Sequence, residues 1–164
     1  MILSPGILAS CFEMLEIISR EALFFVQLPF SLPRIGVCKT TDILSLAQNM
    51  SLVKTGKEGF IELTVSGMKI LSLPSYEDRL FQSILDFIDI FHPPWIQNAL
   101  FGRHKVLSYT GSETKQVFSE AGLASGTDER TIRFWDMLAS RARGQKEDRL
   151  TSIGRHGERL TIQW

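Results

Sequence analysis

With 164 residues, the chain has room for one large domain or two small ones, and its 44% of hydrophobic residues suits a packed core rather than a disordered chain. Its 18 basic and 18 acidic residues give zero net charge, which argues against a general nucleic-acid-coating protein but allows a local basic face. Cys11 and Cys38 have no CxxC spacing and no nearby histidine cluster, so we expect buried free thiols, a reducing compartment and no zinc site.

The apolar N-terminus does not have the pattern of a signal peptide. No basic segment precedes it, and Glu13, Glu16, Arg20 and Glu21 interrupt it early. No apolar run approaches the roughly 18 to 20 residues needed to cross a bilayer. We therefore expect a soluble, cytoplasmic protein.

The first 38 residues predict helices separated by prolines. Ser4-Pro5 is typical of a helix start, and apolar residues follow at helical spacing as far as Ile18. A second apolar run, residues 22–28, either continues this helix or forms a separate one, and Pro29 and Pro33 break it. Residues 34–38 are expected to form a short helix or a turn.

Residues 40–73 carry the clearest secondary-structure pattern, and the rest of the chain is organised around this stretch. Their first part has an apolar helical face, followed by two short strands, 52–53 and 60–63, around a Gly- and Lys-containing turn. Thr64 is well placed to cap a helix that ends before Pro74. The apolar face consists of Ile43, Leu46, Ala47 and Met50. Together with the preceding segments, the order is helix, short helix, helix, wing, helix, which predicts a winged helix-turn-helix.

This stretch also resembles a bacterial winged-helix pattern. That pattern has an apolar helix, Leu-Val, a basic turn and then aromatic-x-x-Leu-Thr-x-x-Gly, represented here by Phe60, Leu63, Thr64 and Gly67. The resemblance covers about a fifth of the chain. It implies the fold, and by itself it does not imply DNA binding.

The remainder predicts a helical extension, so the fold class is mainly α with a small β-hairpin wing. Ser75-x-x-Asp78 fits a capping box, and Thr127 is expected to cap a strong helix that stops at Gly144. Residues 144–148 are expected to be a polar linker. The expected helices span residues 75–91, 95–101, 114–121, 127–143 and 149–164. We therefore divide the chain into a winged-helix domain (1–74), a helical domain (75–144) and a linker helix (145–164).

No active site is recognisable, so we expect no enzyme activity from this chain as it stands, and no metal or cofactor. His92, His104 and His156 form no HxxxH or HExxH arrangement, and neither a Gly-x-Ser-x-Gly nor a GxxxxGK[ST] motif is present. Asp86 and Asp89 are three residues apart on a helix and could share a metal, but an exposed polar face explains them better.

The predicted partner is duplex DNA. A winged helix lays its recognition helix in the major groove while the wing touches phosphate or the minor groove. Glutamine and asparagine pair bidentately with adenine, and lysines neutralise phosphates. The candidate DNA-binding residues are Lys39, Thr41, Ser45, Gln48, Asn49, Lys54 and Lys57, with Thr40 also on this helix. The alternative is a protein-interaction or dimerisation scaffold, whose partner is a second copy or further domains of a longer protein.

A second basic region lies near the C-terminus. It contains Arg141, Arg143, Lys146, Arg149, Arg155 and Arg159. Glu147, Asp148 and Glu158 dilute its charge, which favours a solvated helix face over a phosphate-contacting patch.

The C-terminal third carries a second resemblance. Its three motifs are Glu120-Ala121-Gly122-Leu123, Phe134-Trp135-Asp136-x-Leu138-Ala139 and Ile153-Gly154-Arg155-x-Gly157-Glu158-x-Leu160. They resemble the segment before the nuclease-like domain named after the plant protein NO VEIN, found in bacterial restriction and phage-defence proteins. The resemblance implies a helix that opens a PD-(D/E)XK-type fold, with Glu158 matching the glutamate of that helix.

The departure from this family is informative. In such nucleases the metal-binding Asp and the (Asp/Glu)-x-Lys follow this helix, whereas the sequence stops at Trp164. A Mg²⁺ site needs several converging oxygen ligands, which Glu158 alone does not provide, and a surface or salt-bridging role is its alternative. We therefore expect an N-terminal piece of a longer protein, or a shortened relative, that serves recognition or assembly.

Overall fold

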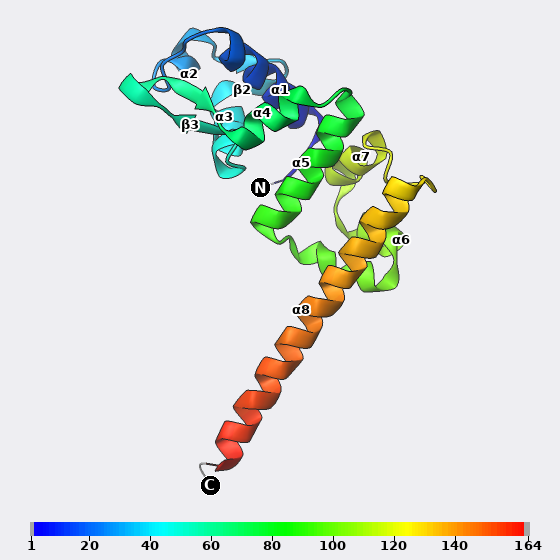
Figure 1. Cartoon of the computed structure of the whole chain (residues 1–164). Helices are drawn as coiled ribbons and strands as arrows, with labels where there is room; N and C mark the ends of the chain where they lie inside the picture. The colour runs from blue at the N-terminus through cyan, green and yellow to red at the C-terminus, as the bar shows by residue number, and fades with distance from the viewer. Residues whose placement is uncertain (1, 163–164) are drawn as a thin grey trace.

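The computed structural model describes residues 2–162, with the side chains of Ser152 and of residues 154–162 outside the description. The protein is mainly helical, with a winged helix at the N-terminal end, a helical extension and one long projecting helix (Figure 1). The predicted fold class is therefore confirmed.

The winged helix begins with α1 (Pro5–Arg20), capped by Ser4 as expected, and the short α2 (Leu28–Ser31). A tight hairpin, β1 (Arg34–Ile35) and β2 (Cys38–Lys39), then leads directly into α3 (Thr40–Asn49). The wing is β3 (Val53–Thr55), the 3-10 turn η1 (Lys57–Gly59) and β4 (Ile61–Leu63), with α4 (Val65–Ser72) behind it.

Residues 22–27 do not form the helix that their apolar run predicts; only Leu28, at its end, is helical, as the first residue of α2. Backbone hydrogen bonds attach this segment to the wing: Phe25 N donates to Gly59 O of η1 at 2.9 Å, and Ile61 N of β4 donates to Leu23 O at 2.8 Å. Phe24 stacks on Phe60 with ring centroids 4.3 Å apart. Satisfying the free edge of β4 outweighs the local helical pattern, and the wing gains a third extended segment.

The connection between α2 and α3 is a hairpin rather than a short helix. Gly36 adopts a φ of 60°, a left-handed conformation that glycine reaches without strain, and this allows the chain to reverse. Pro29 does not break the chain here but lies in the first turn of α2, where proline is tolerated.

The helical extension consists of five elements. They are α5 (Tyr76–Phe91), η2 (Pro94–Phe101), α6 (Arg103–Tyr109), α7 (Ser112–Glu120) and α8 (Glu129–Ile162). Ser75 caps α5 as expected, by accepting a hydrogen bond from Asp78 N at 3.1 Å. The sequence pattern did not predict α6. The buried apolar residues of both halves form one cluster, and Thr114 Oγ1 donates to Leu3 O at 3.1 Å across it.

Two expectations about the last helix are wrong. Its cap is Asp128 rather than Thr127, because Asp128 Oδ1 accepts from the Thr131 hydroxyl at 2.6 Å and Oδ2 from Thr131 N at 3.3 Å. The helix also continues through Gly144, so residues 144–148 are not a linker. Good helix formers on both sides of Gly144 offset the cost of about 1 kcal/mol that one glycine adds.

The corner between α3 and the wing is closely packed. Thr64 Oγ1 accepts from Gly67 N at 3.1 Å and donates to Ser51 O at 2.5 Å. A Cβ at position 67 would overlap the Leu52 carbonyl oxygen. Gly67 is therefore required for the close approach of α4 to the start of the wing.

We expect Gly67→Ala to destabilise the protein by about 2 kcal/mol or more, because the added methyl group meets backbone that cannot rotate away. Chemical denaturation measures the change, and Ser66→Ala, at the exposed neighbour, serves as the matched control. Equal stability of Gly67→Ala and the control would contradict this packing.

Asp128→Ala should lower the thermal midpoint at neutral pH, whereas Thr127→Ala should not. The hydrogen bond from the Thr131 hydroxyl, above all, holds the pKa of Asp128 below its usual value. A folded-state pKa below the unfolded one means that this stabilisation is present at neutral pH and is lost as pH falls through the folded pKa. Melting curves between neutral and acid pH should therefore show the variant and wild type converging on acidification.

Candidate nucleic-acid interface

The outer face of α3 is a polar stripe. Thr41, Ser45, Gln48 and Asn49 are all exposed, and their spacing places them within an arc of about 100°. On the opposite face, Ile43, Leu46 and Ala47 are fully buried. The structure thus brings the four predicted polar side chains of α3 together on one uncovered surface. Asp42 is also exposed and adds a negative charge at the edge of this stripe.

Thr40 is not available to a ligand, unlike its neighbour Thr41. It is completely buried; its hydroxyl donates to Leu32 O, and its backbone N donates to Pro33 O at 3.0 Å. These two bonds attach the first turn of α3 to the segment that follows α2. Thr40 therefore fixes the angle at which α3 leaves the preceding helix.

A pair of cations lies at the start of α3. Lys39 is exposed, and its cross-strand neighbour in the β1–β2 hairpin is Arg34, which is also exposed. The Arg34 Nη2 group donates to Val37 O at 2.7 Å. Sequence reasoning missed Arg34, because the two residues become neighbours only once residues 34–39 form a hairpin.

The wing carries balanced charge. Lys54 and Lys57 are exposed as the sequence predicts, but Glu62 is the cross-strand neighbour of Lys54 and Glu58 follows Lys57 directly. The Glu62 side chain also lies so close to Gly56 that a Cβ there would overlap it. The two lysines therefore act in a nearly neutral environment, which weakens their attraction for phosphate.

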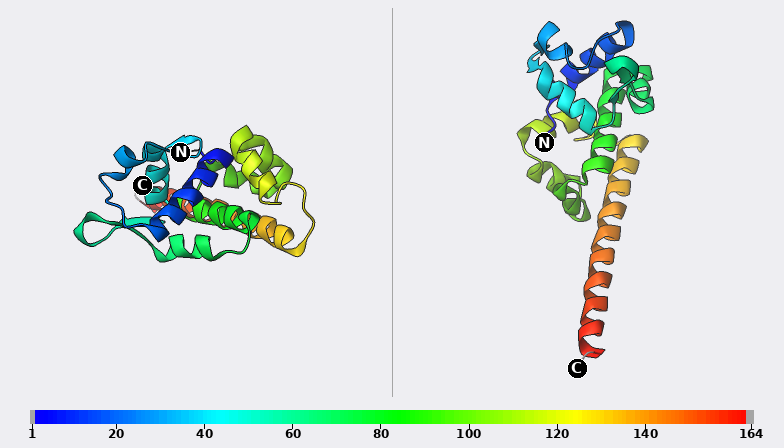
Figure 2. Two further views of the ribbon diagram at one scale, coloured as in Figure 1. Left: turned by 90° about the horizontal axis from the view of Figure 1, so that it is seen from above. Right: turned by 90° about the vertical axis from the view of Figure 1, so that its left-hand side faces the viewer.

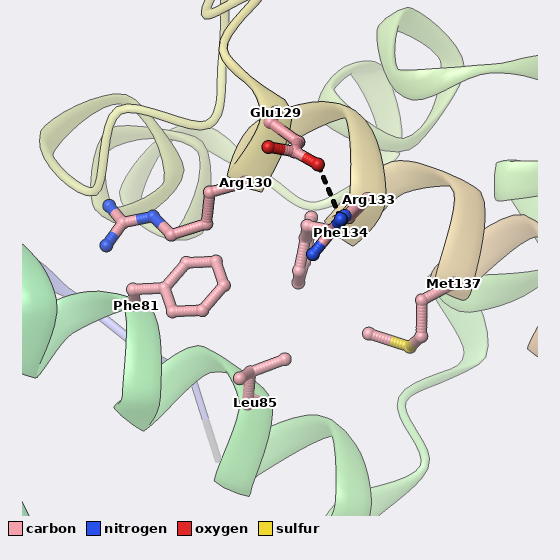
Figure 3. Close-up of a pocket in the computed structure, with 7 residues that line it drawn as sticks. All are labelled: Phe81, Leu85, Glu129, Arg130, Arg133, Phe134 and Met137. Atoms are coloured by element: carbon pink, nitrogen blue, oxygen red, sulfur yellow. Dashed lines mark hydrogen bonds and ion pairs between the residues drawn. The ribbon is translucent and has the colours of Figure 1, made fainter.

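A hollow of about 340 Å³ lies between α5 and α8 (Figure 3). Its floor is apolar, and Arg130 lies over the Phe81 ring at 4.4 Å from the centroid. Arg130 is also paired with Asp78 at 2.6 Å and Glu77 at 3.0 Å, and Arg133 is paired with Glu129 at 2.5 Å. The hydrogen bond from Arg130 lowers the pKa of Asp78. The Arg130 pairs join α8 to α5, whereas the Arg133 pair lies within α8. Because carboxylates of the protein already bind both guanidinium groups, the hollow offers little to an anion.

The two aspartates considered as metal ligands have separate partners. Asp86 accepts from Gln82 Nε2 at 2.9 Å, and burial raises the pKa of Asp86. Asp89 is paired with Arg141 at 2.5 Å, and the second Arg141 nitrogen lies 3.1 Å from His92 Nδ1. Among the described residues, no group of three or more His, Cys, Asp or Glu side chains could hold a metal ion.

The second basic region is only partly available. Arg141 is engaged by Asp89, whereas Arg143, Lys146 and Arg149 are exposed. The side chains of Arg155, Glu158 and Arg159 lie outside the described residues.

Cys11 is a buried free thiol whose pKa is raised to about 12 by burial, and Cys38 is a half-buried free thiol. Over the part of the chain that was described, no helix combines the length and apolar character needed to cross a bilayer.

No protein-family model, curated protein or solved structure matches this chain. The case for a function therefore depends on the geometry of the described side chains.

Replacing Thr40 with valine should cost about 1 to 3 kcal/mol of stability, because the Leu32 carbonyl loses its side-chain donor in a buried position. Thr41→Val, one position along on the exposed face, should leave the free energy of unfolding within about 0.5 kcal/mol of wild type. Urea denaturation of both variants measures the difference. Similar values for the two would show that Thr40 does not anchor α3.

Proposed function

We propose that the winged helix binds duplex DNA by placing α3 in the major groove. The observation that carries this proposal is the uncovered polar stripe of Thr41, Ser45, Gln48 and Asn49 on a helix whose other face is buried. A rigid helix with a free polar face, followed closely by a wing, is the arrangement that winged-helix proteins use to read DNA.

Each group has an assigned role. Gln48 and Asn49 donate and accept hydrogen bonds at adenine edges, and the hydroxyls of Thr41 and Ser45 bond to bases or phosphates. The cations on either side of α3 position the protein on the backbone without reading sequence. These cations are Arg34 and Lys39 on the hairpin, and Lys54 and Lys57 on the wing.

The electrostatic contribution is modest. Asp42, Glu58 and Glu62 are exposed close to these cations in the chain. Only a few phosphates are neutralised, so binding should weaken with salt less steeply than for a strongly basic DNA-binding protein.

The C-terminal third resembles a segment of bacterial restriction and phage-defence proteins, and this resemblance supports a role in such a protein. We propose that the chain is a non-catalytic recognition module of a bacterial restriction or phage-defence protein. The Glu120–Leu123 motif begins at the last residue of α7, and the motifs beginning at Phe134 and Ile153 lie on α8, where one helix connects them.

A protein-interaction scaffold is the alternative, and apolar exposure on the winged helix favours it. Val26, in the turn before α2, is 76% exposed, and Phe30, within α2, is 83% exposed. These side chains offer contact area to another protein and little to a phosphate backbone.

Fluorescence anisotropy with a labelled duplex, titrated at several salt concentrations, distinguishes these functions. Lys54→Ala combined with Lys57→Ala should reduce the slope of log K against log salt by up to about 2, since each lost phosphate contact contributes about 0.9. Lys105→Ala combined with Lys115→Ala removes the same charge from exposed sites on α6 and α7 and should leave the slope unchanged. Binding that is absent, or that both double variants weaken equally, would overturn the proposal.

A further inference from the structure

The exposed face of α3 carries no cationic side chain. The helix sequence is TTDILSLAQN, which contains neither lysine nor arginine. Its exposed side chains end in two hydroxyl groups, two amides and, at the edge of the polar stripe, the carboxylate of Asp42. Any base that α3 contacts is therefore recognised by neutral or acidic groups.

This set of groups is poorly suited to guanine. In the major groove guanine presents two acceptors, N7 and O6, and its usual protein partner is an arginine or lysine that donates to both. Asp42 lies in the first turn of α3, and its carboxylate can only accept. The nearest cations precede the helix: Lys39 is at the N-cap position, and the Arg34 Nη2 group already donates to Val37 O at 2.7 Å.

Adenine matches the two amides. It presents N7 as an acceptor and its N6 amino group as a donor, and a glutamine or asparagine amide offers the complementary donor and acceptor. Gln48 and Asn49 are both exposed at the C-terminal end of α3. Because they are consecutive, their side chains leave the helix about 100° apart, so they reach two different bases.

The other end of the stripe is compatible with thymine. The hydroxyl groups of Thr41 and Ser45 can bond to any base, and the methyl group of a threonine makes an apolar contact with the C5-methyl group of thymine. From Thr41 to Asn49 the stripe is about 12 Å long. Since stacked bases are about 3.4 Å apart, it spans about three to four base pairs.

Phosphate attraction adds little to this surface. Sequence-independent affinity comes from phosphate contacts, and on the wing Glu58 and Glu62 offset the charges of Lys57 and Lys54. The projecting part of α8 extends away from the winged helix (Figures 1 and 2) and is not part of this surface. Base contacts therefore account for a large share of the binding energy at α3.

We propose that α3 selects A·T base pairs, with Gln48 and Asn49 as the residues that bind adenine in the major groove. This inference rests on the proposed function, DNA binding by the winged helix, and adds the class of base pair that the site selects. Asp42 contributes by disfavouring guanine, whose acceptors face its negative charge.

Competition fluorescence anisotropy of the full chain at one fixed salt concentration tests the preference. Two pools of duplexes share length and flanks; the central four base pairs are A·T or T·A in every order in one pool, and G·C or C·G in the other. The A·T pool should bind about tenfold more tightly or better, because each bidentate contact to adenine contributes about fivefold or more. Equal affinities would overturn the inference.

Inosine identifies the groove that is read. Inosine lacks the N2 amino group of guanine, so an inosine·cytosine pair resembles A·T in the minor groove and G·C in the major groove. A pool built with inosine in place of guanine should bind as weakly as the G·C pool. Affinity equal to that of the A·T pool would place recognition in the minor groove and overturn the assignment to α3.

Substitution of the two amides tests the assigned residues. Gln48→Ala and Asn49→Ala should each reduce the ratio of A·T to G·C affinity by about fivefold or more, with unchanged affinity for the G·C pool. Gln116→Ala removes an exposed amide from α7 and should leave the ratio unchanged. Replacing adenine with 7-deazaadenine, which lacks N7, should weaken wild type and have no effect on the Gln48→Ala/Asn49→Ala double variant. A ratio that neither substitution alters would overturn the assignment.

The same titrations separate this inference from the proposed function. Salt-dependent binding of equal strength to both pools would defeat the A·T preference and leave DNA binding intact. Binding to neither pool at low salt would defeat the proposed function, and this inference with it.

Discussion

The corner at which α3 ends and the wing begins depends on a single close approach of backbone to backbone. Thr64 bonds twice to the segment that leads into β3, through its hydroxyl to Ser51 O and through its backbone N to Leu52 O at 3.0 Å. Gly67 lets α4 rest directly on that carbonyl. Because the apolar face of α3 packs into the core on one side of this corner, the direction of the polar stripe follows from it. A displaced corner would move α3 and the wing together.

Local signals predicted the elements that depend on local chemistry. Ser4, Thr64 and Ser75 each cap the helix expected from their position, since a cap involves only residues within one turn. The sequence predicted the apolar face of α3 because its apolar residues recur at the helical period of 3.6 residues within one short segment. The four polar residues of α3 could be named for the same reason, since they occupy the opposite side of that period.

Distant partners explain what the sequence did not predict. Residues 22–24 leave the helical path because the outer edge of the wing, more than thirty residues later, offers hydrogen-bond partners to Leu23 and Phe25. Arg34 joins Lys39 only through the hairpin. Gly144 was expected to end a helix, but no left-handed residue follows there and the helix continues. In each case the deciding interaction, or its absence, lies outside the short stretch of consecutive residues from which a helix or strand is predicted.

Several arginines of this protein connect helices through ion pairs. Arg79, Arg130 and Arg141 are paired with carboxylates on other elements, at 3.0, 2.6 and 2.5 Å respectively. These pairs join α5 to α1 and to α8, so the three arginines contribute to packing between helices. The exposed cations near α3 are also few, so under the proposed function base-edge contacts rather than phosphate attraction would carry most of the selectivity.

The projecting helix also has a mechanical consequence. From Phe134 to Ile162 it is a rod of about 42 Å, so a tilt of about 10° at its base, around Phe134, would displace its tip by roughly 7 Å. The aromatic contacts at that base, such as Phe81 against Phe134 at 5.8 Å between centroids, act as the pivot. A load applied at the far end is therefore amplified into torque on the joint between α5 and α8. Strain at the tip of the rod would be felt first by the helical extension and only then by the winged helix.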